Sequence, residues 1–197
     1  DILTRHIAWD IGTAALTNAL SAALDCEAVL SKVSRLVVDK NRRIDQPGLM
    51  PEVSDTVMIP GNQGLSSAAI EARLDGYYHP YHAALADAVV RKADPVLISV
   101  HSFTPEMNGI QRPWHCGFLY NRDDRLARRA IKHFKALDLT VGDNQPYPGN
   151  VFNATMDRHA EAASHPYLML EVRNDLLQTN HQIAWWCEQI VGFLSTV

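Results

Sequence analysis

The chain has 197 residues, of which 47% are hydrophobic, with 10 glycines and 10 prolines, a composition that suits one compact domain spanning residues 1–197. Its formal charge is only −4 and its 18 basic residues are scattered, so a polyanion-binding surface is excluded and no nucleic acid partner is expected. No stretch of eighteen apolar residues and no basic-then-apolar leader occurs, so neither a membrane partner nor a signal peptide is expected.

The three cysteines, Cys26, Cys116 and Cys187, are odd in number and far apart, and none lies in a CxxC pair. This usage is typical of reduced thiols in a cytoplasmic compartment. We therefore expect them to fill the core.

The first element predicted along the chain is a helix that runs to about Leu24. Ile11, Ala14, Ala15, Leu20 and Ala23 recur at helical spacing, and Asp10 stands near the start of the pattern. A carboxylate there suits the positive end of the helix dipole, so Asp10 is either a cap or, beside His6 and Trp9, a functional residue.

A short strand is predicted next, at Leu36–Val38, and polar residues follow it directly. Asn41 and Arg42 lie in this polar segment. A planar guanidinium beside an amide suits a bidentate grip on a carboxylate, and a surface salt bridge is the alternative interpretation.

The segment from Ile44 to Ser66 is rich in proline and glycine, which favours a binding loop or lid over disorder. Helices are predicted at Ala68–Leu74 and Tyr77–Lys92. His82, in the second helix, either faces a site or packs in the core.

The central strand is predicted in the segment Pro95–Gly109, because Val96, Leu97, Ile98 and Val100 form a short apolar run. The run stops at His101. Open α/β sheets place ligand and metal groups at the carboxyl ends of their strands, so His101 is a candidate for such a role. By itself, a hydrogen-bonded loop histidine is the commoner case.

A strand at Cys116–Tyr120, an amphipathic helix at Asp124–Leu137 and a short strand at Leu139–Val141 are predicted next. The last strand leads into the turn-rich sequence GDNQPYPGN, which contains Asn144 and Tyr147. The basic residues of the helix are expected to be solvated.

A second apolar run, Tyr167–Val172, contains Glu171, and Arg173 follows it. A buried carboxylate is costly unless it is paired or functional, and desolvation raises its pKa toward the range of a general base, so a functional role is favoured. The final helix is predicted at Thr179–Leu194. Strands that alternate with helices indicate a mostly parallel sheet with helices on both faces.

Five short motifs together resemble the N-formylglutamate amidohydrolase family over nearly the whole chain. They occur in the family's order and are SRLVVDKNR, the PYH of Pro80–His82, the HS of His101–Ser102, DNQPY and LEVRND. The VDxNR pattern is also similar to zinc carboxypeptidases and aspartoacylases, which share a fold with this family.

The resemblance implies a three-layer αβα fold with a mixed, mostly parallel sheet, like that of zinc carboxypeptidases. It implies a zinc-dependent hydrolase of the amide bond of an N-formyl or N-acyl amino acid, with N-formyl-L-glutamate giving glutamate and formate. Its implied roles are metal ligation by His101 and Asp10, water activation by Glu171, and binding of a substrate carboxylate by Asn41 and Arg42. The chemistry of formamide hydrolysis also needs an oxyanion donor, for which Arg35 is the candidate, and further substrate contacts, for which the candidates are Arg173, Asn144 and Tyr147.

Departures from the family pattern leave alternatives open. Family members carry a further metal-binding histidine in a strand near the N-terminus. His6 matches it poorly, so this strand is expected upstream of Asp1. Lys40 also replaces an apolar residue of the VDxNR pattern. The alternatives are a zinc carboxypeptidase-like peptide or peptidoglycan amidase, and a metal-free binding homologue; no oligomeric state is predicted.

Overall fold

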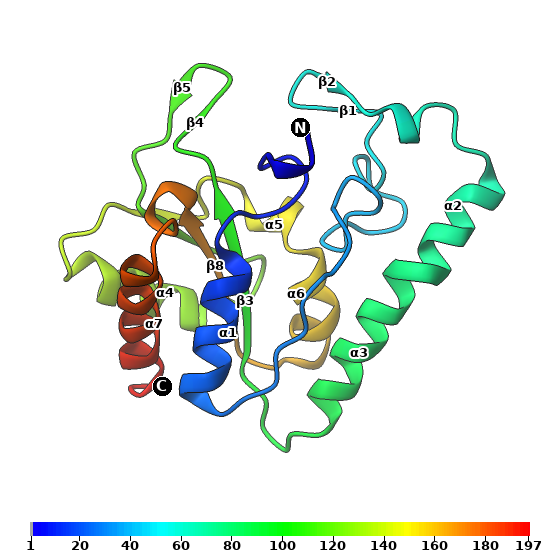
Figure 1. Ribbon diagram of the computed structural model, residues 1–197. Coiled ribbons are helices and arrows are strands. Elements are labelled where there is room, and N and C mark those ends of the chain that lie inside the picture. The colour runs from blue at the N-terminus through cyan, green and yellow to red at the C-terminus, as the bar shows by residue number, and fades with distance from the viewer. Residues whose placement is uncertain (1) are drawn as a thin grey trace. The chain divides into compact units, whose positions relative to one another are not determined.

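The computed structural model describes residues 2–197 (Figure 1). The chain divides into two compact units. We call Asp10–Ala28 with Asp94–Val197 the sheet unit, and Asp1–Trp9 with Val29–Ala93 the loop unit. The prediction of a single domain stays a prediction, and each unit is described by itself.

The sheet unit is built on a four-stranded mixed sheet in the order β3-β8-β6-β7. β3 pairs with β8, and β6 with β7, in parallel, whereas β6 pairs with β8 antiparallel. The strands are β3 (Leu97–Phe103), β6 (Cys116–Leu119), β7 (Val141–Asp143) and β8 (Tyr167–Arg173). A separate hairpin joins β4 (Glu106–Met107) to β5 (Ile110–Gln111).

Helices cover both faces of this sheet, which confirms the predicted α/β class with its mixed, mostly parallel sheet. On one face, Leu168, Leu170 and Val172 of β8 pack in the main core with α1 (Thr13–Leu24), α4 (Arg125–Lys135) and α7 (Asn180–Leu194). The other face is met by a second group of elements, which are α5 (Gly149–Phe152), α6 (Ala154–His159) and η4 (Glu161–Ala163). A last turn, η5 (Asn174–Leu176), leads into α7.

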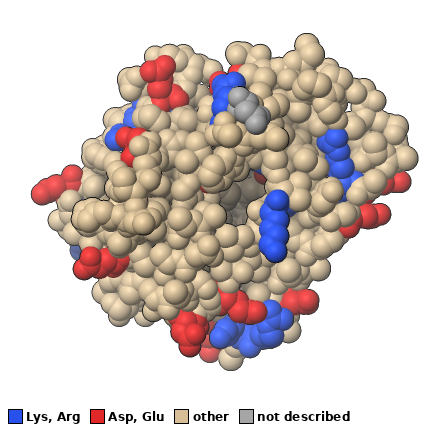
Figure 2. Space-filling model, in the orientation of Figure 1, with Lys and Arg blue, Asp and Glu red and all other residues tan. Residues whose placement is uncertain are grey.

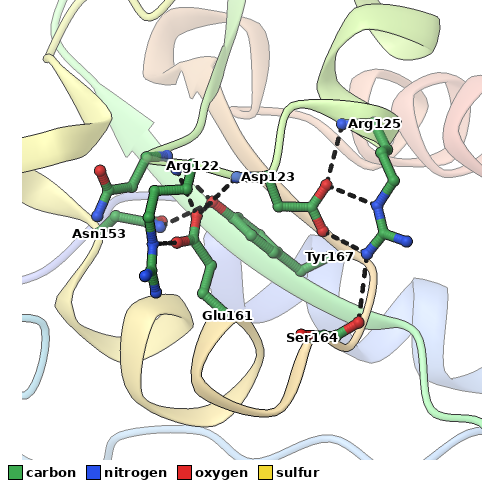
Figure 3. A network of polar contacts seen from close by, with 8 residues as sticks. Arg122, Asp123, Arg125, Asn153, Glu161, Ser164 and Tyr167 are labelled. Carbon is green, nitrogen blue, oxygen red and sulfur yellow. Dashed lines mark hydrogen bonds and ion pairs between the residues drawn. The ribbon is translucent and has the colours of Figure 1, made fainter.

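Tyr167, the first residue of β8, is held in a polar network at the start of that strand (Figure 3). Its hydroxyl donates to Glu161 Oε1 at 2.8 Å, and the backbone N–H groups of Arg122 and Asp123 donate to the same oxygen at 2.8 and 3.1 Å. Burial alone would raise the pKa of Glu161, but these hydrogen bonds hold it below its usual value. The carboxylate therefore joins the connection after β6 to the start of β8.

Most predicted elements of the sheet unit are confirmed, with shifted ends. α7 begins after Thr179, whose side chain and that of Gln182 form a reciprocal capping box. β7 starts at Val141, two residues later than predicted. The predicted end of the central strand was wrong, because β3 continues through His101 to Phe103 in register with β8.

The loop unit contains helices and short strands. They are η1 (Ile2–Thr4), β1 (Val53–Ser54), β2 (Val57–Met58), η2 (Pro60–Asn62), α2 (Ser67–Arg73), a π-helical turn η3 (Leu74–Tyr78) and α3 (His79–Val90). The segment predicted as a lid thus carries the hairpin of β1 and β2. His82 packs inside this unit, with Nε2 3.1 Å from the Lys40 carbonyl oxygen.

The strand predicted at Leu36–Val38 was wrong, although Leu36 and Val38 are buried. Asn62 donates its amide to the Leu36 carbonyl at 2.8 Å, and Arg73 donates to the Val37 carbonyl at 3.0 Å. Side chains distant in the sequence therefore satisfy the backbone here, and no strand ladder forms.

Basic side chains do not gather on the face shown in Figure 2, where they are separated by neutral and acidic residues. Among residues 2–197, no helix has the length and apolar character needed to span a membrane. Cys116 and Cys187 are buried, as expected, whereas Cys26 is exposed.

Candidate functional site

His101 and Asp10 lie in direct contact in the sheet unit. His101 Nδ1, on β3, is 2.6 Å from Asp10 Oδ2, and the two side chains are 21% and 15% exposed. The contact therefore links His101, inside β3, to Asp10, which lies just before α1. An imidazole nitrogen and a carboxylate oxygen this close together can form a hydrogen bond with each other or can both coordinate a metal cation.

The chain around Asp10 is fixed by the residues that follow it. Thr13 donates to the Asp10 carbonyl from its hydroxyl at 2.8 Å, and Ser102 Oγ donates to the Ile11 carbonyl at 2.8 Å. Gly12 caps α1 with φ 85, and a Cβ there would lie 2.4 Å from Leu177 Cβ. The side chain of Asp10 is therefore not the helix cap, because its carboxylate meets His101.

Glu171 stands beside this pair on the neighbouring strand. It is the register partner of His101, so both side chains project from the same face of the sheet. Glu171 is only 5% exposed, and the residues of β8 on either side of it, Leu170 and Val172, are buried and apolar. A buried carboxylate on the strand position next to an imidazole has the chemistry of a general base.

Two glycines extend this row across the sheet. Gly117 of β6 is the register partner of Glu171, and Gly142 of β7 is the partner of Gly117. A Cβ on Gly117 would come within 1.8 Å of the Gln145 carbonyl oxygen, and one on Gly142 within 2.7 Å of the same atom. The absence of side chains thus lets the backbone of the loop after β7 lie directly on the sheet next to Glu171.

Tyr147, at the far end of that loop, contacts a residue that the sequence did not single out. Its hydroxyl accepts a hydrogen bond from Arg112 Nη1 at 3.0 Å. The Arg112 guanidinium also lies 5.8 Å from the centroid of the Phe103 ring. No sequence pattern marked Arg112, because arginines are ordinarily exposed and burial of this one follows only from the fold.

Two other predicted substrate-binding residues of the sheet unit have protein partners. The Asn144 side-chain oxygen accepts from the backbone N–H of Tyr120 and of Gly149, at 2.9 and 3.1 Å, and so shapes the loop. Arg173 Nε donates to Asp175 Oδ1 at 2.8 Å. Contact of Arg173 with a substrate carboxylate would therefore compete with Asp175, and both assignments stay predictions.

Arg35, Asn41 and Arg42 belong to the loop unit, where a buried carboxylate organises them. Arg35 Nη2 donates to Asp39 Oδ2 at 2.7 Å, and the Asn41 N–H donates to Oδ1 at 2.9 Å. Burial would raise the pKa of Asp39, but the charges of Arg35 and Arg42 and these hydrogen bonds lower it. The predicted roles of the three residues toward substrate stay predictions.

The donors in the sheet unit fit part of a zinc site. Zinc in hydrolases takes imidazole nitrogen and carboxylate oxygen ligands, commonly three from the protein. Asp10 and His101 supply one of each at hydrogen-bonding distance. Within residues 2–197, no group of three or more His, Cys, Asp or Glu side chains is arranged to hold a metal ion.

Comparison with known proteins identifies the family. The family model of N-formylglutamate amidohydrolase matches residues 1–178. The crystal structure of gene product Atu2144 from Agrobacterium tumefaciens is 32% identical, with a TM-score of 0.94 over 100% of this chain and 81% of that one. Comparison with curated proteins gave no match.

A more distant structure shares the fold. N-formylglutamate amidohydrolase from Ralstonia eutropha JMP134 is 20% identical, with a TM-score of 0.66 over 92% of this chain and 78% of that one. The family match, over most of the length, assigns the chain to hydrolases that act on a small-molecule amide. The chain belongs to the N-formylglutamate amidohydrolase family.

Proposed function

We propose that this protein is a zinc-dependent amidohydrolase that cleaves N-formyl-L-glutamate to glutamate and formate. The family match and the geometry of the sheet unit support this proposal. The observation that carries it is the contact of His101 Nδ1 with Asp10 Oδ2 at 2.6 Å, in register with the buried Glu171. An imidazole, a carboxylate ligand and a separate carboxylate base are the groups that such hydrolysis needs.

Asp10 and His101 would hold the metal, one through a carboxylate oxygen and one through an imidazole nitrogen. When bound, zinc supplies Lewis acidity, which acidifies water and polarises a carbonyl oxygen. Asp10 is suited to this role because the hydrogen bonds of Thr13 and Ser102 fix the backbone around it. Preorganised ligands of this kind keep their geometry when the cation is absent.

Glu171 would move the proton. It accepts a proton from the attacking water, whose oxygen forms a bond to the formyl carbon, and passes it to the nitrogen as the C–N bond breaks. Burial at 5% exposure keeps bulk water from competing for that proton. The backbone of Gln145, which lies on Gly117 next to Glu171, closes the same side of the site.

The test is formate release from N-formyl-L-glutamate by the purified protein, with glutamate measured in parallel. We expect equal amounts of the two products, loss of activity after chelation, and recovery when zinc is added back. Glu171→Gln should retain its metal but lose activity by about 1000-fold or more, as removal of a general base predicts. A peptide or peptidoglycan fragment serves as the comparison substrate.

Three results would reject the proposal. One is full activity of the metal-stripped protein, and another is wild-type activity of Glu171→Gln. The third is cleavage of the peptide or peptidoglycan amide in preference to the formamide. Binding of N-formyl-L-glutamate without turnover in the zinc-loaded protein would point to a binding homologue.

A further inference from the structure

Arg112 is a buried cation that the proposed chemistry does not use. Its guanidinium carbon lies over two aromatic rings, 5.8 Å from the centroid of Phe103 and 5.1 Å from that of Tyr147. The residue is 8% exposed. The backbone around it is fixed, because its N–H donates to the Pro105 carbonyl at 2.8 Å.

Among residues 2–197, no carboxylate lies within ion-pair distance of Arg112. Its guanidinium has five N–H groups, and their protein acceptors are the Tyr147 hydroxyl, at 3.0 Å from Nη1, and the Met107 sulfur, which Nη2 contacts. A thioether is a weak acceptor, and three N–H groups remain.

Other arginines of the sheet unit do pair with carboxylates. Arg122, Arg125 and Arg128 are exposed and Arg173 is half-buried, and each of them has an Asp or Glu partner. A buried charge is costly unless it is paired, so the absence of a carboxylate around Arg112 indicates that an anion from outside the chain completes its environment.

The position of Arg112 suits one end of a short substrate. Phe103 lies two residues after His101 on β3, hence on the same face and about 6.6 Å along the strand. In an extended N-formylglutamate, the side-chain carboxylate lies about 6 Å from the formyl carbon, and the α-carboxylate about 4 Å or less. The spacing therefore fits the side-chain carboxylate better.

We propose that Arg112 binds the side-chain carboxylate of an acidic N-acyl amino acid and so makes this protein specific for acidic substrates. The inference rests on the proposed amidohydrolase function and adds a specificity residue to it. The two rings hold the guanidinium plane, and the Tyr147 hydroxyl fixes its orientation, so that a carboxylate can accept two parallel N–H bonds.

The test compares N-formyl-L-glutamate with N-formyl-L-glutamine, which has the same shape without the charge. In Arg112→Met, we expect kcat/KM for the glutamate substrate to fall by about 100-fold or more and that for the glutamine substrate to change by less than about 3-fold. Arg158→Met, a substitution of an exposed arginine on α6, is the matched control and should change neither value.

Arg112→Lys guards against a folding defect in the methionine variant, because it keeps the charge but not the bidentate fork. It should lose about 10-fold on the glutamate substrate alone. Equal losses on both substrates in folded Arg112→Lys, or in folded Arg112→Met, would overturn the inference.

Binding of the product L-glutamate, measured by calorimetry, gives a readout that needs no turnover. Wild type should bind it, and Arg112→Met should bind it about 100-fold more weakly. If the wild-type protein releases no formate from either substrate, the proposed function fails, whereas unchanged glutamate affinity in Arg112→Met defeats the Arg112 assignment alone.

Discussion

At the scale of single residues, the site depends on a contact between side chains that are 91 residues apart in the chain, Asp10 and His101. The neighbouring contact, from Ser102 to the Ile11 carbonyl at 2.8 Å, sets the register of the two segments. Sequence alone indicated His101 and Glu171, because polar residues interrupt apolar strands. Whether Asp10 was a cap or a functional residue required the structure, in which its carboxylate meets the imidazole.

Glu161 allows a residue-scale prediction that is independent of catalysis. Its side chain accepts hydrogen bonds from two backbone N–H groups and Tyr167, and its pKa lies below the usual value despite burial. We expect Glu161→Gln to lower the free energy of unfolding at pH 7 by about 2 kcal/mol. Urea unfolding measures this, with exposed Glu188→Gln as the control.

The contribution of Glu161 to the free energy of unfolding depends on pH with a defined sign. A carboxyl group whose pKa is lowered in the folded state stabilises the protein above its unfolded pKa, here the reference value of 4.5. That stabilisation is lost as the pH falls through the folded-state pKa. The difference between wild type and Glu161→Gln should therefore shrink at acid pH, and a difference that grows on acidification would contradict the assignment.

At the scale of elements, the row from His101 through Glu171 to Gly117 and Gly142 crosses all four strands of the sheet. The sequence predicted the strands, because their apolar runs are clear. The predicted end of β3 was too early, because His and Ser are common in loops. In the structure, His101 and Ser102 continue the pairing of β3 with β8. Polar residues inside a strand are a feature of a site built on the face of a sheet.

The glycine row yields an element-scale prediction. Gly117→Ala places a Cβ within 1.8 Å of the Gln145 carbonyl, so the loop that carries Tyr147 must shift. We expect kcat/KM to fall by about 10-fold or more and stability to drop by about 1–3 kcal/mol.

The control for this variant is Gly192→Ala. Gly192 lies in α7, and a Cβ there meets nothing within 4 Å. Helix propensity alone should raise the stability of Gly192→Ala by about 0.5–1 kcal/mol, with activity unchanged. If Gly117→Ala proves as active and stable as wild type, the backbone of Gln145 does not shape the site.

At the scale of the whole molecule, the sheet unit and the helices α2 and α3 of the loop unit were predictable, whereas the loop unit's Leu36–Val38 segment was not. Alternating apolar strands and amphipathic helices specify the first through periodicity. In the loop unit, side chains of Asn62 and Arg73 satisfy the carbonyls of the predicted strand, and such distant pairings leave no local pattern. The buried Arg112 was missed for the same reason, because its burial depends on Phe103 and Tyr147.

The most direct test of the central claim is the zinc content of three purified proteins: wild type, His101→Ala and Glu171→Gln. We expect about one zinc per chain in wild type and in Glu171→Gln, and almost none in His101→Ala, because His101 is a proposed metal ligand whereas Glu171 is a proposed base. Formate release should then occur in wild type alone. Stoichiometric zinc in folded His101→Ala would contradict the account, because the pair of His101 and Asp10 would not be the metal site.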